Sequence, residues 1–249
     1  MSGPRNSSLP LAGKTALVIG GSRGIGRAIV ERFAADEALI AFSYVEREQA
    51  ATELAEAIAH RGGRAVPLKA DLASSKEIRA LFDDAEKALG GLDIVVVNAA
   101  IAVIKPMIEL SDEDFDRVFA VNAKGAFVAL QEAARRVRNG GRIIVTSTGG
   151  TQMLMTQTAL YLGSKGAVEQ FVRVLAREIG PRGVTVNAVS PGYTDTELLP
   201  ARDRAVAAAS SPFNRVGQPE DVAEAFAFLA GESGRWITGQ NIAAGGGVF

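Results

Sequence analysis

The segment "ALYLGSKGAVEQF" at 159–171 holds two side chains whose types and spacing could move a proton. Tyr161, one of three tyrosines in the chain, is followed four positions later by Lys165, and most neighbouring residues are small or apolar. A phenol has a pKa of about 10, so it is a poor acid–base at neutral pH unless its charged form is stabilised. An ammonium group at position i+4 lies on the same helix face and lowers that pKa by attraction. The pattern favours an acid–base pair, and the alternative is a half-buried tyrosine beside a surface lysine.

A glycine-rich turn within "ALVIGGSRGIGRAIV" (16–30) provides a candidate nucleotide site. Gly20, Gly24 and Gly26 follow an apolar strand-like run and lead into a helical pattern. Glycine lets the backbone turn tightly and approach a pyrophosphate, and the free N–H groups at the start of the next helix bind phosphate. This context predicts dinucleotide binding, with a plain turn and a glycine cap as the alternative.

The residues that follow the second predicted strand indicate which dinucleotide is bound. An acidic residue there usually binds the adenosine ribose of NAD, but this chain has Ser43 and Tyr44, with Glu46 two positions further on. Arg23 in the glycine loop and Arg47 after the strand could pair with a 2′-phosphate. We therefore favour NADP(H) and keep NAD(H) as possible. The alternative is that both arginines are solvated surface charges.

Short β-rich runs alternate with longer helical patterns along the chain. The predicted strands are 14–19, 38–44, 64–70, 92–100, 141–147, 183–190 and a short edge strand near 239–244. The predicted helices are 26–36, 49–61, 75–89, 111–138, 158–180 and 219–231. This alternation predicts a single-domain, Rossmann-like α/β fold with a doubly wound parallel sheet of about seven strands. We interpret 1–10 as a flexible tail, 11–249 as a dinucleotide-binding catalytic domain, and the unpatterned 191–218 as a lid or binding loop.

Composition excludes several classes of function. The net charge of -1 provides no field that would attract nucleic acid or an anionic membrane. The chain has no cysteine for disulfides or thiolate chemistry, and a single histidine, His60, excludes a histidine-rich metal site. The start "MSGPRNSSLP" lacks the apolar core of a signal peptide, and no apolar run approaches the ~20 residues of a membrane span. We therefore expect a cytoplasmic protein.

Over residues 11–247 the chain resembles the short-chain dehydrogenases/reductases, and among them the acyl-carrier-protein ketoreductases and hydroxynaphthalene reductases. Besides the glycine loop, the matching motifs are "ADL" (70–72), "NAA" (98–100), "VNAKG" (121–125), "YLGSK" (161–165), "PGYTDT" (191–196) and "ITGQ" (237–240). The resemblance implies an NADP(H)-dependent oxidoreductase that transfers a hydride between nicotinamide and a small-molecule carbonyl or secondary alcohol. It implies that Tyr161 is the acid–base and that Lys165 tunes it and binds the nicotinamide ribose. The alternative is a protein that binds NADP(H) as a sensor or scaffold without turnover.

The resemblance also implies roles for other positions. Asn122 is expected to hold a water of a proton relay, Asp71 and Leu72 to hold the adenine edge, and Asn98 and Ala99 to line the adenosine ribose. The positions expected to contact the cofactor are Gly20, Ser22, Arg23, Gly24, Ile25, Gly26, Ser43, Tyr44, Asp71, Leu72, Asn98, Ala99, Ala100, Tyr161, Lys165, Pro191, Gly192, Thr194 and Thr196.

The chain departs from the family pattern at three positions. Ile19 replaces the threonine that usually precedes the glycine motif, Val97 replaces an asparagine, and Ala244 replaces the aspartate of a C-terminal Asp-Gly-Gly. Ile19 and Val97 remove hydrogen bonds thought to link the first and fourth strands. Loss of a hydrogen bond is nearly neutral when both partners become apolar. We interpret the pair as a compensating apolar swap that leaves the cofactor site intact.

Two adjacent hydroxyls compete for the position beside the tyrosine. The family places a serine commonly 13 residues before it, where this chain has Thr148, while Ser147 lies 14 before it. Neighbours on a strand face opposite sides, so we expect only one of them to reach the substrate oxygen unless Gly149 and Gly150 allow a bend. We favour Thr148, whose hydroxyl can donate the same hydrogen bond.

Specificity is expected to reside in 150–158 and in a substrate loop near 193–213. Met153, Leu154 and Met155 suggest an apolar pocket wall, although methionine often only fills space. The resemblance further implies a homo-oligomer of four subunits, with the helices at 111–138 and 158–180 and the C-terminal "AAGGGVF" in the contacts.

Overall fold

Seven strands form one parallel sheet in the computed structural model, which describes residues 9–249. The strands are β1 (Thr15–Ile19), β2 (Leu39–Tyr44), β3 (Arg64–Lys69), β4 (Leu92–Val97), β5 (Val137–Thr146), β6 (Thr185–Pro191) and β7 (Asn241–Ala244). Their order across the sheet is β3-β2-β1-β4-β5-β6-β7, and every pair is parallel. The predicted doubly wound sheet and its number of strands are therefore confirmed.

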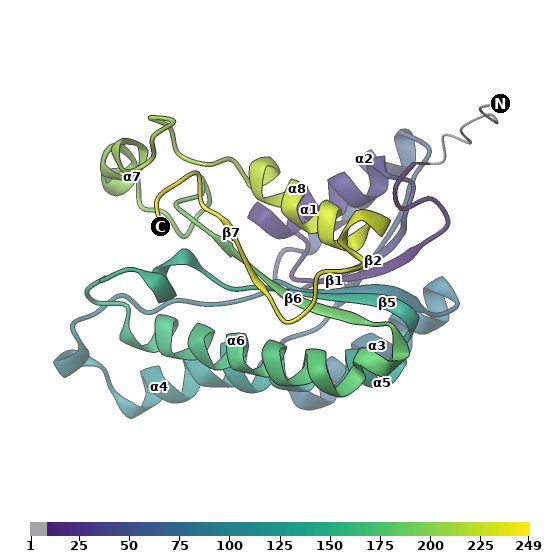
Figure 1. The fold of residues 1–249 in the computed structure, drawn as a ribbon, viewed down its shortest axis with the longest axis horizontal. Helices are drawn as coiled ribbons and strands as arrows, with labels where there is room; N and C mark the ends of the chain where they lie inside the picture. Colours follow the sequence, from purple (N-terminus) through teal and green to yellow (C-terminus); the bar gives the residue numbers. More distant parts are fainter. Residues whose placement is uncertain (1–8) are drawn as a thin grey trace.

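Helices cover both faces of this sheet (Figure 1). The helices on one face are α1 (Gly24–Ala35), α2 (Glu48–His60) and α8 (Pro219–Ala230). Those on the other face are α3 (Ser75–Leu89), α4 (Asp112–Phe119), α5 (Ala126–Arg136) and α6 (Ala159–Ile179). The short α7 (Arg204–Ser210) lies apart from both layers. Single 3₁₀ turns occur at Met107–Glu109, Gly149–Gln152, Gly180–Arg182, Ala201–Asp203 and Glu232–Gly234.

The core is split into two layers by the sheet. Strands covered on both faces are almost continuously apolar, and all five residues of β1, of which only Thr15 is polar, are buried. Successive side chains of a strand therefore belong to hydrophobic clusters on opposite faces of the sheet. Leu17 packs in the cluster with α3, α5 and α6, whereas Val18 packs in the cluster with α1, α2 and α8. This double layer fixes the strand ends, which position the functional loops.

The two central strands are also linked by polar contacts at the ends where they begin. The Asp93 carboxylate accepts hydrogen bonds from the backbone N–H and the hydroxyl of Thr15, both at 2.9 Å. Burial alone would raise the pKa of Asp93, but the hydrogen bonds from Thr15 and Arg138 outweigh it and lower that pKa below its ordinary value. The carboxylate therefore stays charged and holds β1 beside β4.

The helix predicted at 111–138 is present from Asp112 to Arg136, but it is not one regular α-helix and it ends earlier than predicted. The chain instead forms α4, a wider π-helical turn at Ala120–Gly125, and then α5, and β5 already begins at Val137. Val137 takes an extended backbone and pairs with Leu92 of β4. A π turn is a rare single turn inside a helix that no residue type marks, so sequence alone did not reveal it.

The unpatterned stretch 191–218 contains α7 and the 3₁₀ turn before it, which the prediction did not include. Most of the predicted tail, residues 1–8, lies outside the described residues. Within 9–249, no helix combines the length and the apolar character that crossing a bilayer requires.

Candidate active site

The candidate residues gather at the carboxyl ends of the strands, where the strand order reverses. Chain order runs outward from β1 to β2 and β3 on one side, and from β4 to β7 on the other. In open parallel sheets, the crevice at such a reversal is the usual ligand site. The glycine loop follows β1, Asn98 follows β4, and the two candidate hydroxyls follow β5.

Tyr161 and Lys165 lie in the first two turns of α6, as their spacing predicts. Tyr161 is half-buried and Lys165 is buried, with its Nζ 5.9 Å from the centre of the tyrosine ring. Lys165 donates a hydrogen bond of 2.7 Å to the carbonyl oxygen of Thr146, at the end of β5. That bond anchors the ammonium group beneath the phenol.

The pKa values of this pair reflect its burial. Desolvation lowers the pKa of Lys165 to about 8, against a smaller opposing effect of the Glu169 carboxylate. Desolvation also raises the pKa of Tyr161, and a hydrogen bond with Thr148 opposes that rise. At neutral pH the protein alone therefore holds a neutral phenol next to an ammonium group, which is the state required to donate a proton.

The structure separates the two neighbouring hydroxyls. The Thr148 hydroxyl is the group that opposes the rise that burial causes in the pKa of Tyr161, and its oxygen accepts a hydrogen bond of 3.2 Å from the N–H of Gly150. Ser147 is buried and donates a hydrogen bond of 2.6 Å to the Glu169 carboxylate, which Thr151 also contacts. Strand alternation thus points Thr148 at the phenol and Ser147 into a separate network.

Asn122 lies in the π-helical turn and is almost fully buried. Its amide exchanges two hydrogen bonds with the backbone of Ile101, of 2.8 and 2.9 Å, and donates a third to Ser164 on α6. Ser164 in turn donates to the carbonyl oxygen of Tyr161 at 2.7 Å. The side chain therefore ties the loop after β4 to the turn that carries the tyrosine.

The glycine loop has the geometry that a dinucleotide phosphate requires. Gly20 and Gly24 have φ angles of 82° and 51°, in the left-handed region that favours glycine. A Cβ atom on Gly26 would lie 1.9 Å from the carbonyl oxygen of Gly20, so only glycine fits there. No side chain within the described residues caps the start of α1, and its first turn carries no acidic residue. Its N–H groups are thus available for phosphate, and the loop fits the predicted cofactor.

Several predicted cofactor residues instead shape that loop. The Ser43 hydroxyl, almost fully buried, accepts a hydrogen bond of 2.9 Å from the N–H of Gly20. Asn98 donates one of 2.9 Å to the carbonyl oxygen of Gly20 and accepts another from the Thr146 hydroxyl. The Leu72 side chain is buried in the core. The side chains of Ser43 and Leu72 thus face the protein, and the contact of these positions with the cofactor stays a prediction.

The two family departures in the central strands face each other. Ile19 and Val97 are register partners in the β1–β4 pair and are both buried in the same cluster. Neither leaves a polar partner unsatisfied, which supports the predicted apolar swap. The backbone N–H groups of Asn98 and Ala99 still reach the Ile19 carbonyl, each at 3.0 Å.

The segment after β6 approaches the glycine loop from above. Gly192 packs against Gly245, leaving no room for a side chain, and Thr194 is buried and donates to the Gly192 carbonyl at 3.1 Å. The methyl carbon of Thr196 lies 3.3 Å from the position of a Cβ atom on Gly24. The remaining predicted positions, Ser22, Ile25, Tyr44, Asp71, Ala100 and Pro191, lie in or beside these same strand-end loops.

Two arginines meet at a carboxylate that the sequence did not reveal. Arg47 contacts both oxygens of Glu197, at 2.6 and 2.8 Å, and Arg23 contacts the same carboxylate. The three residues come from the loops after β2, β6 and β1. Because each is distant from the others in sequence, no local motif could have indicated their meeting.

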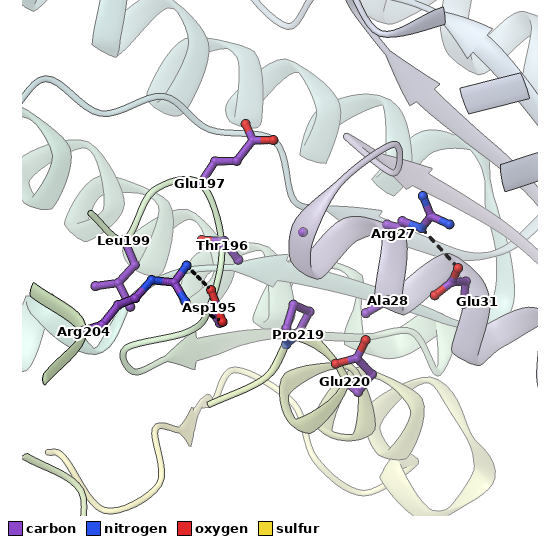
Figure 2. Close-up of a pocket in the computed structure, with 11 residues that line it drawn as sticks. Arg27, Ala28, Glu31, Asp195, Thr196, Glu197, Leu199, Arg204, Pro219 and Glu220 are labelled. Carbon is purple, nitrogen blue, oxygen red and sulfur yellow. Dashed lines mark hydrogen bonds and ion pairs between the residues drawn. The ribbon is translucent and has the colours of Figure 1, made fainter. Parts of the chain in front are cut away.

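A cavity of about 460 Å³ opens between α1, α8 and the segment at 195–204 (Figure 2). It borders Gly24 of the glycine loop but not Tyr161, and charged side chains such as Arg27, Glu31 and Glu220 line it. We regard this cavity as the outer flank of the nucleotide region and not as the substrate pocket, because the acid–base pair is elsewhere.

The residues predicted to form an apolar pocket wall, 153–155, are partly exposed to solvent. Leu154 is fully exposed, whereas Met155 lies against Gly150. Phe249, which was predicted from the sequence only in a subunit contact, packs its ring directly on Gly149 and Gly245. The segment after β5 is therefore covered by an aromatic ring from a residue that is distant in sequence.

Comparison with known proteins assigns the family. The model of a family described as enoyl-(acyl carrier protein) reductase matches residues 19–249. The chain is a short-chain dehydrogenase/reductase. It is 40% identical over 255 residues to the hydroxynaphthalene reductase-like protein Arp2 of Metarhizium majus, covering 95% of each chain. The expected relationship to hydroxynaphthalene reductases is therefore confirmed, and the chain belongs to a family of oxidoreductases.

Solved structures of other members have the same fold. A short-chain dehydrogenase from Burkholderia cenocepacia, in complex with NADP, superposes with a TM-score of 0.92 at 39% identity, over 96% of this chain and 99% of that one. The angucycline C-6 ketoreductase LanV, with bound NADP, gives a TM-score of 0.92 at 42% identity and 96% coverage of both chains.

Proposed function

We propose that the protein is an NADP(H)-dependent oxidoreductase that transfers a hydride between nicotinamide and a carbonyl or secondary alcohol. The nicotinamide would supply or accept the hydride, and the protein supplies position, charge and a proton. The observation that carries the proposal is the position of the Tyr161 phenol, whose ring centre lies 5.9 Å from the buried ammonium group of Lys165 and whose pKa, which burial raises, is partly lowered again by the Thr148 hydroxyl.

In the direction of reduction, Tyr161 donates its phenolic proton to the substrate oxygen while the carbonyl carbon accepts the hydride. The products are the alcohol and a phenolate, which the Lys165 ammonium group stabilises. Thr148 donates a hydrogen bond to the oxygen as its negative charge develops. Asn122 ties the loop after β4 to the turn of α6 that carries Tyr161 and contributes to the return of a proton to the phenol.

The preference for NADP(H) is supported by the convergence of Arg23 and Arg47. Two guanidinium groups that already share one anion have the geometry to hold a phosphate. The solved Burkholderia and LanV structures, which contain NADP, provide independent support. The glycine loop and the segment 191–196 would hold the remainder of the dinucleotide.

The test is a panel of ketones and alcohols followed at the nicotinamide absorbance with both cofactors, on the native protein and on Tyr161→Phe. We expect at least one substrate class to be converted with NADP(H), and turnover to fall ~10²-fold or more in the variant, the usual scale of general acid–base catalysis. Cofactor binding, titrated directly, should be retained. Near-native turnover of Tyr161→Phe would refute the assignment of the acid–base. Binding without conversion of any compound would favour the sensor or scaffold alternative.

We also propose that the protein forms a homo-oligomer, a tetramer in the family's manner, through α5 and α6. Phe127 on α5 is 47% exposed and packs edge-on against Phe171 on α6. An apolar aromatic pair left at the surface of two neighbouring helices is a suitable centre for a symmetric contact.

A further inference from the structure

The Glu197 carboxylate occupies an anion-binding site that two arginine side chains form. Arg47 contacts it with both terminal nitrogens, and Arg23 contacts it from the other loop. A carboxylate and a phosphate both accept parallel hydrogen bonds from guanidinium groups, so the arrangement is equally suited to a phosphate. Under the proposed function, the cofactor's 2′-phosphate and Glu197 therefore require the same two arginines.

The ion pairs of Glu197 with Arg23 and Arg47 are exposed enough for another anion to replace the carboxylate. The side chains of Arg23, Arg47 and Glu197 are 53%, 50% and 53% exposed, so water screens their attraction. Ion pairs this exposed contribute little to stability and form and break readily. A dianionic phosphate, which offers more oxygens and more charge, can displace a single carboxylate from such a site.

The segment that carries Glu197 also covers the glycine loop. Thr196, the preceding residue, lies beside Gly24 and would touch a side chain there, and Asp195 pairs with Arg204 at 2.8 Å at the start of α7. In Figure 2, Glu197 projects away from the Asp195–Arg204 pair. The segment at 195–204 is therefore held by two contacts, one through Asp195 and one through Glu197. Breaking the Glu197 contact would remove one of these two attachments.

We propose that Glu197 is an intramolecular competitor for the 2′-phosphate and the latch of the segment at 195–204. The inference rests on the proposed NADP(H) preference and adds a residue that sets its strength. Arrival of a 2′-phosphate displaces the carboxylate and frees the segment from the two arginines. NAD(H), which has no phosphate at that position, leaves the latch closed.

The first test measures dissociation constants of NADPH, NADH, adenosine 2′,5′-bisphosphate and 5′-AMP by titration, without turnover. Glu197→Gln keeps the size of the side chain and removes its charge. We expect NADPH and the bisphosphate to bind about three- to tenfold more tightly to this variant, the scale of one or two exposed ion pairs, with NADH and 5′-AMP unchanged. Glu220→Gln is the matched control, because Glu220 lines the same cavity and its loss changes the net charge equally.

The outcomes separate the two proposals. If the native protein does not distinguish the bisphosphate from 5′-AMP, and Arg23→Ala changes nothing, the NADP(H) preference itself fails. If the native protein does distinguish them but Glu197→Gln binds the bisphosphate no more tightly than the native protein or Glu220→Gln, only the latch fails. Weaker NADH binding by Glu197→Gln would also overturn it, because the carboxylate would then hold the ribose hydroxyls.

The second test reports on the segment directly. Arg202 and Arg204 follow the latch, and Arg202 is 80% exposed, so trypsin can sample the opening of this stretch. We expect adenosine 2′,5′-bisphosphate to speed cleavage there roughly threefold in the native protein, because local opening governs proteolysis, while 5′-AMP has no effect. Glu197→Gln should be cleaved rapidly from the start and show no response. Equal cleavage of both proteins under all conditions would contradict the latch.

Discussion

Replacing Thr148 with valine should separate the two hydroxyls that follow β5. The variant keeps the branched shape of the side chain and removes only its hydroxyl, which contacts Tyr161 and accepts from the N–H of Gly150. Loss of one donor to a developing oxyanion costs about 2–4 kcal/mol, which corresponds to a roughly 30- to 900-fold lower kcat. The unpaired Gly150 N–H adds a stability cost of about 1 kcal/mol.

Ser147→Ala is the matched comparison. Its hydroxyl is directed to Glu169, which keeps its contact with Thr151 at 2.8 Å, so kcat should stay within about threefold of native. Thr148→Ser should restore most of the activity, because it returns the hydroxyl. The assay is kcat with the best substrate of the panel, together with thermal unfolding of each variant. A larger loss in Ser147→Ala than in Thr148→Val, or mild losses in both, would refute the assignment.

Two further predictions concern the acid–base pair and the assembly. Burial lowers the pKa of Lys165 to about 8, so its ammonium group is lost as pH rises through that value, and kcat/KM for carbonyl reduction should fall above it. Because the Glu169 carboxylate opposes this lowering, Glu169→Gln should move the fall to lower pH; a profile that stays flat to strongly alkaline pH in both proteins would contradict the role. The mass in solution should exceed the 26.0 kDa of one chain at low micromolar concentration, and Phe127→Glu should reduce it by placing a charge at the exposed α5–α6 pair. A native monomer at that concentration would exclude the assembly.

Sequence reasoning succeeded where the signal was local. Apolar runs predicted the seven strands, and the glycine spacing placed the turn between β1 and α1, because the backbone conformation of Gly20 and Gly24 is decided within a few residues. The neighbouring positions of Ser147 and Thr148 implied opposite directions, although their contacts with Glu169 and Tyr161 came only from the structure.

Features that depend on distant segments were missed. The π-helical turn around Asn122 is accompanied by hydrogen bonds to Ile101 and Ser164, neither of which marks the sequence near 122. Glu197 meets Arg47 from a loop 150 residues away, and Phe249 reaches Gly149 from the end of the sequence. Such contacts are consequences of how the strands are ordered, so they could be found only after the sheet was assembled.

The strand order has a consequence for how the chain reaches this fold. The two middle strands, β1 and β4, join through Thr15 and Asp93, which are 78 residues apart. During synthesis, β1 can pair with β2 well before β4 emerges, so the backbone N–H and C=O groups on the other edge of β1 stay unpaired until β4 is made. Long-range parallel pairing is slow, and an open strand edge is prone to pair with another chain. Refolding from denaturant should therefore be slow and should lose yield as protein concentration rises.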